Sequence, residues 1–107
     1  MIPVNDPKLD GHEKNYLIKA IESGWISSDG AFVNQFEEGF SKYLGAKYGI
    51  AVSNGTAALE VALYSAGVCE GDEVIMPSFT IISCAIAAIR LGAKPVFVDV
   101  EQENWCI

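Results

Sequence analysis

The segment Tyr48–Leu59 reads YGIAVSNGTAAL and contains the features that decide the fold. Its first part, Tyr48–Val52, is a short apolar run that is predicted to form a strand. The run ends in Ser-Asn-Gly-Thr, and a helix rich in Ala and Leu is predicted from about Thr56 to Ala66, where Gly67 ends it. A buried strand joined to a helix by a short turn is the basic unit of α/β proteins.

The residues that follow continue the same alternation. Strands are predicted over Asp72–Met76 and Pro95–Asp99, with a helix between them from Phe79 or Thr80 to Leu91. The strand candidates are near-continuous apolar runs, which is typical of parallel strands covered on both faces. Residues 47–107 are therefore predicted to form a βαβαβ unit with parallel strands.

Residues 1–46 are predicted to form a separate helical segment. Asp10 and Glu13 have the spacing of a capping box, and apolar residues then recur at helical spacing up to Gly24. A second helix is predicted up to Gly45, with one apolar stripe that includes three phenylalanines. This stripe is interpreted as a core face or a subunit interface. The turn-rich residues between the two helices, 25–30, carry Trp25.

Composition excludes several classes of protein. The chain has 107 residues and a formal net charge of −7, so it is one domain at most and lacks the basic footprint of a nucleic-acid-binding protein. No apolar run approaches the roughly 20 residues of a membrane helix, and the first residues do not resemble a secretory signal. Three cysteines without metal-ligand spacing favour a reduced, cytoplasmic location. No metal site or catalytic triad can be assembled around the single histidine, His12, which is interpreted as a surface residue.

The turn after the first predicted strand is a candidate anion site. The first backbone N–H groups of a helix lack partners within the helix, and the helix dipole favours an anion there. Gly55 would let the backbone approach a phosphate closely, and Thr56 would add a hydroxyl donor. The same residues could equally form an ordinary helix cap, and the turn itself does not separate these alternatives.

The other strand ends are less informative. Pro77-Ser78-Phe79-Thr80 lies at the same edge of the predicted sheet and could meet a ligand, or Thr80 could simply cap the next helix. Asp99 ends the last predicted strand and could face the same edge or be a solvated carboxylate. Trp105 is interpreted as a core or interface residue.

Several motifs in fixed order give the chain a family resemblance. They are Gly24-Trp25-Ile26-Ser27-Ser28, Phe36-Glu37, Tyr43-Leu44-Gly45, Val52–Leu59, Gly71–Ile75, Pro77–Thr80 and Gly92–Asp99. This combination resembles the N-terminal part of the DegT/StrS-type sugar aminotransferases, and within them the perosamine-synthase-like members. The resemblance implies the large domain of a fold-type I enzyme that depends on pyridoxal 5′-phosphate (PLP), and residues 47–107 would be the first βαβαβ part of that domain, which is incomplete here.

The resemblance also implies roles for individual residues. Gly55, Thr56 and Ala57 would hold the PLP phosphate through backbone amides and the Thr56 hydroxyl. Ile81 stands where many relatives have an aromatic residue stacked on the cofactor ring, so it would give up a stacking contribution of roughly 0.5–1.5 kcal/mol. Ser27 is a candidate substrate-binding residue, in a loop often contributed across a dimer.

The family's Schiff-base lysine and the carboxylate that pairs with the pyridine nitrogen have no counterpart among these residues. The chain is therefore expected to be an N-terminal fragment with no catalytic residue of its own. The fold-type I topology that the resemblance implies would also leave the Tyr48–Val52 strand without its neighbouring strands, so the isolated chain is expected to be poorly soluble or partly folded. The parent is expected to be a homodimeric enzyme that transfers an amino group, with glutamate as donor, to a nucleotide-linked 4-keto-6-deoxy sugar. A sugar dehydratase of the same fold and a non-catalytic regulatory or interaction module are the alternatives.

Overall fold

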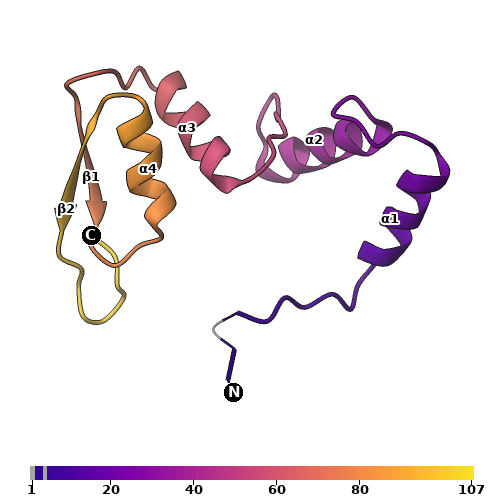
Figure 1. Ribbon diagram of the computed structural model, residues 1–107, viewed down its shortest axis with the longest axis horizontal. Helices are drawn as coiled ribbons and strands as arrows, with labels where there is room; N and C mark the ends of the chain where they lie inside the picture. The colour runs from indigo at the N-terminus through magenta and orange to yellow at the C-terminus, as the bar shows by residue number, and fades with distance from the viewer. Residues whose placement is uncertain (1, 4) are drawn as a thin grey trace. The chain divides into compact units, whose positions relative to one another are not determined.

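A computed structural model describes residues 2–3 and 5–107 (Figure 1). Its elements follow one another in the order α1 (Glu13–Glu22), α2 (Ala31–Leu44), α3 (Gly55–Ser65), β1 (Glu73–Pro77), α4 (Ile82–Arg90) and β2 (Lys94–Val98). The chain divides into two compact units, Met1–Ala51 and Val52–Ile107. None of the helices among the described residues is long and apolar enough to cross a bilayer.

The second unit is built around a βαβ arrangement. Strands β1 and β2 are parallel neighbours, with Glu73 opposite Lys94 and Pro77 opposite Val98, and the pairing continues through the Ser78 amide, which donates to the Val98 carbonyl oxygen at 2.8 Å. Helix α4 packs on both strands, and α3 packs on α4. This confirms the α/β class, and it places the start of α4 at the carboxyl ends of the strands.

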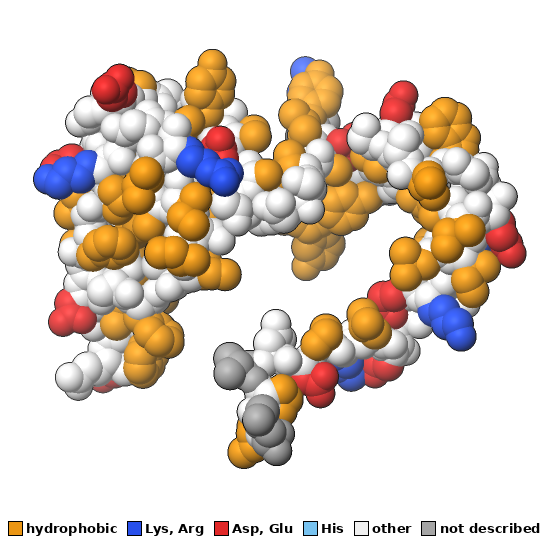
Figure 2. All heavy atoms as spheres, in the orientation of Figure 1, with side chains coloured by type: hydrophobic (Ala, Val, Ile, Leu, Met, Phe, Trp, Pro, Cys, Tyr) orange, Lys and Arg blue, Asp and Glu red, His pale blue; other side chains and the backbone are white. Residues whose placement is uncertain are grey.

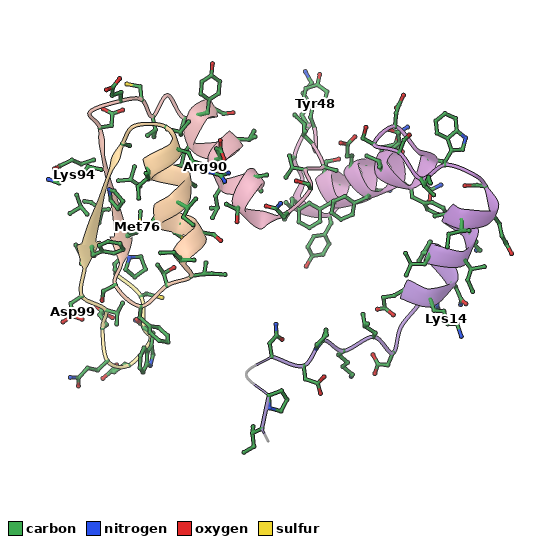
Figure 3. All side chains as sticks on the ribbon, viewed as in Figure 1. Lys14, Tyr48, Met76, Arg90, Lys94 and Asp99 are labelled. Atoms are coloured by element: carbon green, nitrogen blue, oxygen red, sulfur yellow. The ribbon has the colours of Figure 1, made fainter. Side chains whose placement is uncertain are left out.

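The core of this unit is small and rich in alanine. Met76, labelled in Figure 3, packs with Ala85, Ala88 and Ala93, and only 5% of its surface is exposed. Alanines on the inner face of α4 let the helix backbone come close to the sheet, because they place no bulk between the two layers. The polar ends of Asn54, Thr56 and Ser83 are thereby held at one end of a packed helix pair.

The sheet is covered on one face rather than on two. Val74 and Met76 are half-buried or buried, whereas Ile75 between them remains 64% exposed. The expectation of a sheet covered on both faces is therefore wrong for the described residues, because α3 packs on α4 and leaves the opposite face of the strands open. Figure 2 shows apolar side chains at the surface over the region of β1, β2 and α4.

The predicted strand over Tyr48–Val52 is not formed, so the expected βαβαβ order becomes αβαβ. A strand requires a neighbour for its backbone groups, and no described strand pairs with this segment. The segment lies instead against α2: the Ala51 amide donates to Glu37 Oε1 at 2.7 Å, and a Cβ on Gly49 would come within 2.7 Å of the Glu37 carbonyl oxygen. Ile50 remains 80% exposed.

Two predicted helix starts are also corrected. Helix α1 begins after His12, and Glu13 Oε2 accepts from the Gly11 amide at 2.9 Å, so the capping box expected from Asp10 is absent. Helix α4 begins after Ile81 rather than at Phe79 or Thr80, because the bend at residues 78–80 turns the chain back from β1. The predicted end of α2 is confirmed, since Gly45 adopts the left-handed conformation with φ of 66°.

Candidate functional site

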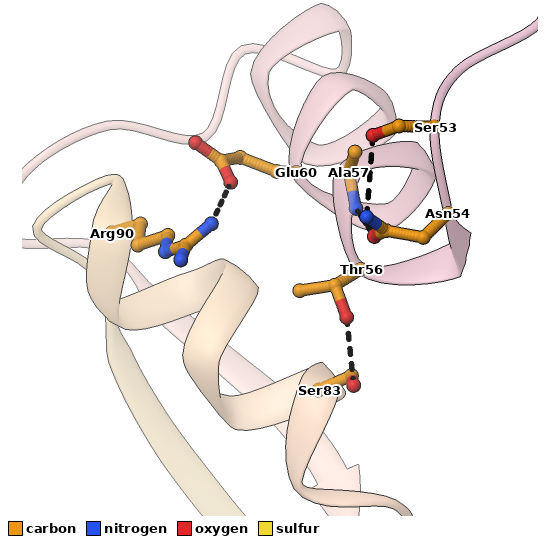
Figure 4. A network of polar contacts seen from close by, with 7 residues as sticks. All are labelled: Ser53, Asn54, Thr56, Ala57, Glu60, Ser83 and Arg90. Carbon is orange, nitrogen blue, oxygen red and sulfur yellow. Dashed lines mark hydrogen bonds and ion pairs between the residues drawn. The ribbon is translucent and has the colours of Figure 1, made fainter.

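The turn that enters α3 is organised by Asn54. This residue is extended, with φ of −168° and ψ of 171°, and its side-chain oxygen accepts from the Ala57 amide at 3.0 Å. Its Nδ2 group donates in turn to Ser53 Oγ at 3.2 Å (Figure 4). The arrangement is that of a regular N-cap, in which a side-chain oxygen satisfies one of the free amides of the first helical turn.

The Gly55 and Thr56 amides are donors of the first turn of α3 that this cap does not satisfy. No described residue accepts a hydrogen bond from either of them. Gly55 is not among the glycines with positive φ, and a Cβ added to it would meet nothing within 4 Å. Neither the backbone conformation nor a neighbour therefore requires glycine at this position. The open space beside two free amides at a helix start fits a phosphate group, which needs both donors and clearance.

The Thr56 side chain links this turn to α4. Its hydroxyl donates to Ser83 Oγ at 2.9 Å, and both residues are half-buried (Figure 4). Farther along the same helix pair, Arg90 Nη1 lies 3.0 Å from Glu60 Oε2. Both Thr56 and Ser83 lie in the first turn of their helices, so the positive ends of two helix dipoles are brought to one place.

The structure places the remaining predicted site residues as follows. Ile81 is the N-cap residue of α4, two positions before Ser83, and 67% of it is exposed, so its side chain is available to a ligand beside the α3 turn. Ser27 lies in the first unit, exposed, in the turn that precedes α2, and its role stays a prediction. Asp99 accepts a hydrogen bond from the next amide, that of Val100, at 2.9 Å.

Two features of this edge were not predicted from the sequence. Ser83 has no role in the sequence predictions, although a serine in the first helical turn after a strand is a recognisable signal for a polar contact. Trp105 packs its ring on Phe79, with centroids 4.8 Å apart, and its own backbone has φ of 60°. The Trp105 amide donates to the Glu101 carbonyl oxygen at 2.9 Å. This hydrogen bond closes a short loop over residues 101–105, and the indole at its end packs on Phe79, just after β1.

The family model for DegT/DnrJ/EryC1/StrS aminotransferases matches residues 7–107. The chain belongs to this family. Its relatives include GDP-perosamine synthase from Vibrio cholerae, 45% identical over 104 residues, which are 97% of this chain and 28% of that protein. The 3-amino-5-hydroxybenzoate synthase of Amycolatopsis mediterranei is 50% identical over 100 residues, 92% of this chain and 26% of the relative. The chain thus spans little more than a quarter of these relatives' length.

Solved structures agree with this assignment. The PLP form of a putative sugar aminotransferase, Spr1654 from Streptococcus pneumoniae, superposes with a TM-score of 0.82 at 31% identity. The match covers 97% of this chain and 26% of that one. A crystal structure of 3-amino-5-hydroxybenzoic acid synthase gives a TM-score of 0.80 at 48% identity, over 92% of this chain and 26% of the other. The α/β fold is therefore that of the aminotransferase family.

The described residues of the second unit place no lysine beside the turn that enters α3. Lys94 is the single lysine of the second unit, and its Nζ lies 2.9 Å from Glu73 Oε1. Lys94 begins β2, whereas the α4 start and Ile81 lie at the carboxyl ends of the strands, so this lysine is at the wrong edge for the site. No group of three or more metal-ligating side chains occurs within residues 2–3 and 5–107.

Proposed function

We propose that the full-length protein carrying this chain is a PLP-dependent enzyme that transfers an amino group to a nucleotide-linked 4-keto-6-deoxy sugar. Glutamate is the proposed amino donor. The observation that carries the proposal is the pair of free amides at Gly55 and Thr56, in a chain that matches GDP-perosamine synthase from Vibrio cholerae over 97% of its length. Bound PLP supplies the reactive aldehyde and the electron sink that amino transfer requires.

The proposed work of this chain is to bind and orient the cofactor. The Gly55 and Thr56 amides would donate to the phosphate, and the dipole of α3 favours its negative charge. The Ala57 amide already donates to Asn54 Oδ1, so it joins the cradle only if the phosphate replaces that oxygen. Ile81, exposed beside Ser83, would pack an aliphatic face on the pyridine ring. The lysine and the acid that complete the chemistry are assigned to the rest of the protein.

We also propose that the full-length enzyme is a cytoplasmic homodimer. Apolar side chains on α1 and α2 support this, since Tyr16 and Phe32 meet edge to face and Phe36 stacks on Phe40, with all but Phe32 exposed. A second copy would cover this surface, and Ser27, in the loop between the two helices, would then face a substrate. Sedimentation of the full-length protein tests the dimer, and a monomer at micromolar concentration would contradict it.

The test of function uses the full-length protein with PLP, glutamate and a nucleotide-linked 4-keto-6-deoxy sugar. Mass spectrometry is expected to show the aminated sugar, and borohydride is expected to trap the cofactor on the protein. Lys94→Ala is the control: it is expected to keep full activity, because this exposed lysine pairs with Glu73. A deoxygenated sugar without amination would identify the dehydratase instead. No turnover and no PLP absorbance would favour the non-catalytic module.

A further inference from the structure

Among the described residues, a single side-chain hydrogen bond joins the turn that enters α3, where the phosphate is proposed to bind, to the start of α4. Ser83 is the residue of α4 that forms it. Its Oγ accepts from the Thr56 hydroxyl at 2.9 Å, across 27 positions of sequence. Both side chains are half-buried, so water competes weakly for the bond. The Thr56 hydroxyl is therefore held in one orientation by a residue outside its own helix.

We propose that Ser83 is a positioning residue for the cofactor phosphate and acts through Thr56, an inference that rests on the proposed function. A hydroxyl donates one hydrogen bond and accepts two, and its hydrogen rotates to suit its partners. In the structure Thr56 donates to Ser83. A phosphate dianion is an acceptor only, so Thr56 must turn its hydrogen to the phosphate, and Ser83 then donates to Thr56 in return.

With the direction of this hydrogen bond reversed, the Thr56 and Ser83 hydroxyls both keep a hydrogen-bond partner when the phosphate is bound. Without Ser83, the half-buried Thr56 hydroxyl would still donate its hydrogen to the phosphate, but its oxygen would accept no hydrogen bond from α4. A hydroxyl that accepts a hydrogen bond is also the better donor, since bonds in a chain polarise one another. Ser83 thus orders the Thr56 side chain and strengthens its contact with the anion, without touching the cofactor.

The loss of one such bond sets the size of the effect. A hydrogen bond between neutral groups contributes a net effect equivalent to about a 2- to 10-fold change in affinity. Ser83→Ala is therefore expected to raise the Kd for PLP by about 2- to 10-fold. Ser83→Thr keeps the hydroxyl and is expected to restore the affinity. Ser65→Ala removes an exposed serine at the other end of α3 and serves as the matched control.

The experiment is a spectroscopic titration of the full-length protein with PLP and, separately, with pyridoxal, which lacks the phosphate. Ser83→Ala is expected to weaken PLP and leave pyridoxal unchanged, and to shift the phosphorus NMR signal of bound PLP. In a Thr56→Val background, Ser83→Ala is expected to add nothing, because Thr56 then has no hydroxyl to position. Equal weakening of PLP and pyridoxal, or additive effects of the two substitutions, would overturn the role of Ser83.

The same titration separates this inference from the proposed function. If Thr56→Val weakens PLP and Ser83→Ala does not, the phosphate site stands and the role of Ser83 is wrong. If neither Thr56→Val nor Ser83→Ala changes the Kd for PLP, the Thr56 hydroxyl does not bind the phosphate and the role of Ser83 is overturned. The proposed function, which rests on the Gly55 and Thr56 backbone amides, is then decided by the amination assay and by the PLP affinity of Gly55→Ala. Thermal melts of each variant, with Ser83→Thr as the folded reference, identify any loss that comes from unfolding.

Discussion

Gly55→Ala separates the stability of the chain from its ability to bind a phosphate. Gly55 is the first residue of α3, it is not among the glycines with positive φ, and a Cβ there would meet nothing within 4 Å. The folded chain therefore has room for the methyl group. The free amides at Gly55 and Thr56 are nevertheless where the phosphate would approach, and the added carbon would narrow that approach.

The two effects have opposite signs. Replacing glycine by alanine at a compatible position stabilises a protein by about 0.4–1 kcal/mol, because the unfolded chain loses freedom. A hydrogen bond to a charged group contributes about 1.5–3 kcal/mol, so losing one amide–phosphate bond corresponds to a roughly 10- to 150-fold weaker Kd. Gly55→Ala is thus expected to melt at the same or a higher temperature and to bind PLP far more weakly.

Gly39→Ala is the matched control for this substitution. Gly39 is an exposed glycine within α2, and a Cβ on it would likewise meet nothing within 4 Å. It is expected to stabilise the helix by up to about 1 kcal/mol and to leave the affinity for PLP unchanged. Titration of the full-length proteins with PLP, followed by thermal melts, measures both quantities.

The reasoning fails if Gly55→Ala binds PLP as tightly as the unchanged protein. Such a result would mean that the phosphate does not approach the α3 start. A large fall in the melting temperature of Gly55→Ala would refute the prediction that the folded chain has room for the methyl group, because it would show that the space around Gly55 is occupied.

Three further substitutions probe the second unit. Asn54→Ala removes the cap on the Ala57 amide and is expected to cost about 1 kcal/mol of stability, seen as a lower melting midpoint, while PLP affinity does not fall. Met76→Ala empties a core position and is expected to cost about 2–5 kcal/mol in denaturant unfolding; a loss below 1 kcal/mol would contradict the packing. Asp72 raises the pKa of the Cys69 thiol, first through its hydrogen bond and then through its charge, so Asp72→Asn is expected to shift alkylation of Cys69 by iodoacetamide to lower pH. An unchanged pH dependence of Cys69 alkylation would contradict the hydrogen bond between Cys69 and Asp72.

Much of the fold was predictable because its signals are local. The helix of residues 31–44 is marked by its apolar stripe and by the glycine that ends it, and both lie within a few turns of one another. The strands β1 and β2 and the helix between them follow from apolar runs and short turns. The helix starts were less certain, because a bend or a shifted cap moves them by two or three residues without changing the pattern.

The strand expected over Tyr48–Val52 shows where local patterns fail. An apolar run of that length has the composition of a buried strand, but a strand forms only beside another one. No described strand pairs with it, and the segment instead lies against α2 through Glu37. The same limit applies to the open face of the sheet at Ile75, whose exposure depends on what packs there and not on the residue itself.

The candidate site divides in the same way. The sequence by itself determined the family, the α/β alternation and the Ser-Asn-Gly-Thr turn before α3, because each of these depends on residues that are close together along the chain. Only the tertiary structure decided that Asn54 holds the Ala57 amide, that Gly55 and Thr56 keep theirs free of described partners, and that Thr56 meets Ser83. The physical reason is distance along the chain: Thr56 and Ser83 are 27 positions apart, and the packing of α3 on α4 brings their hydroxyls together.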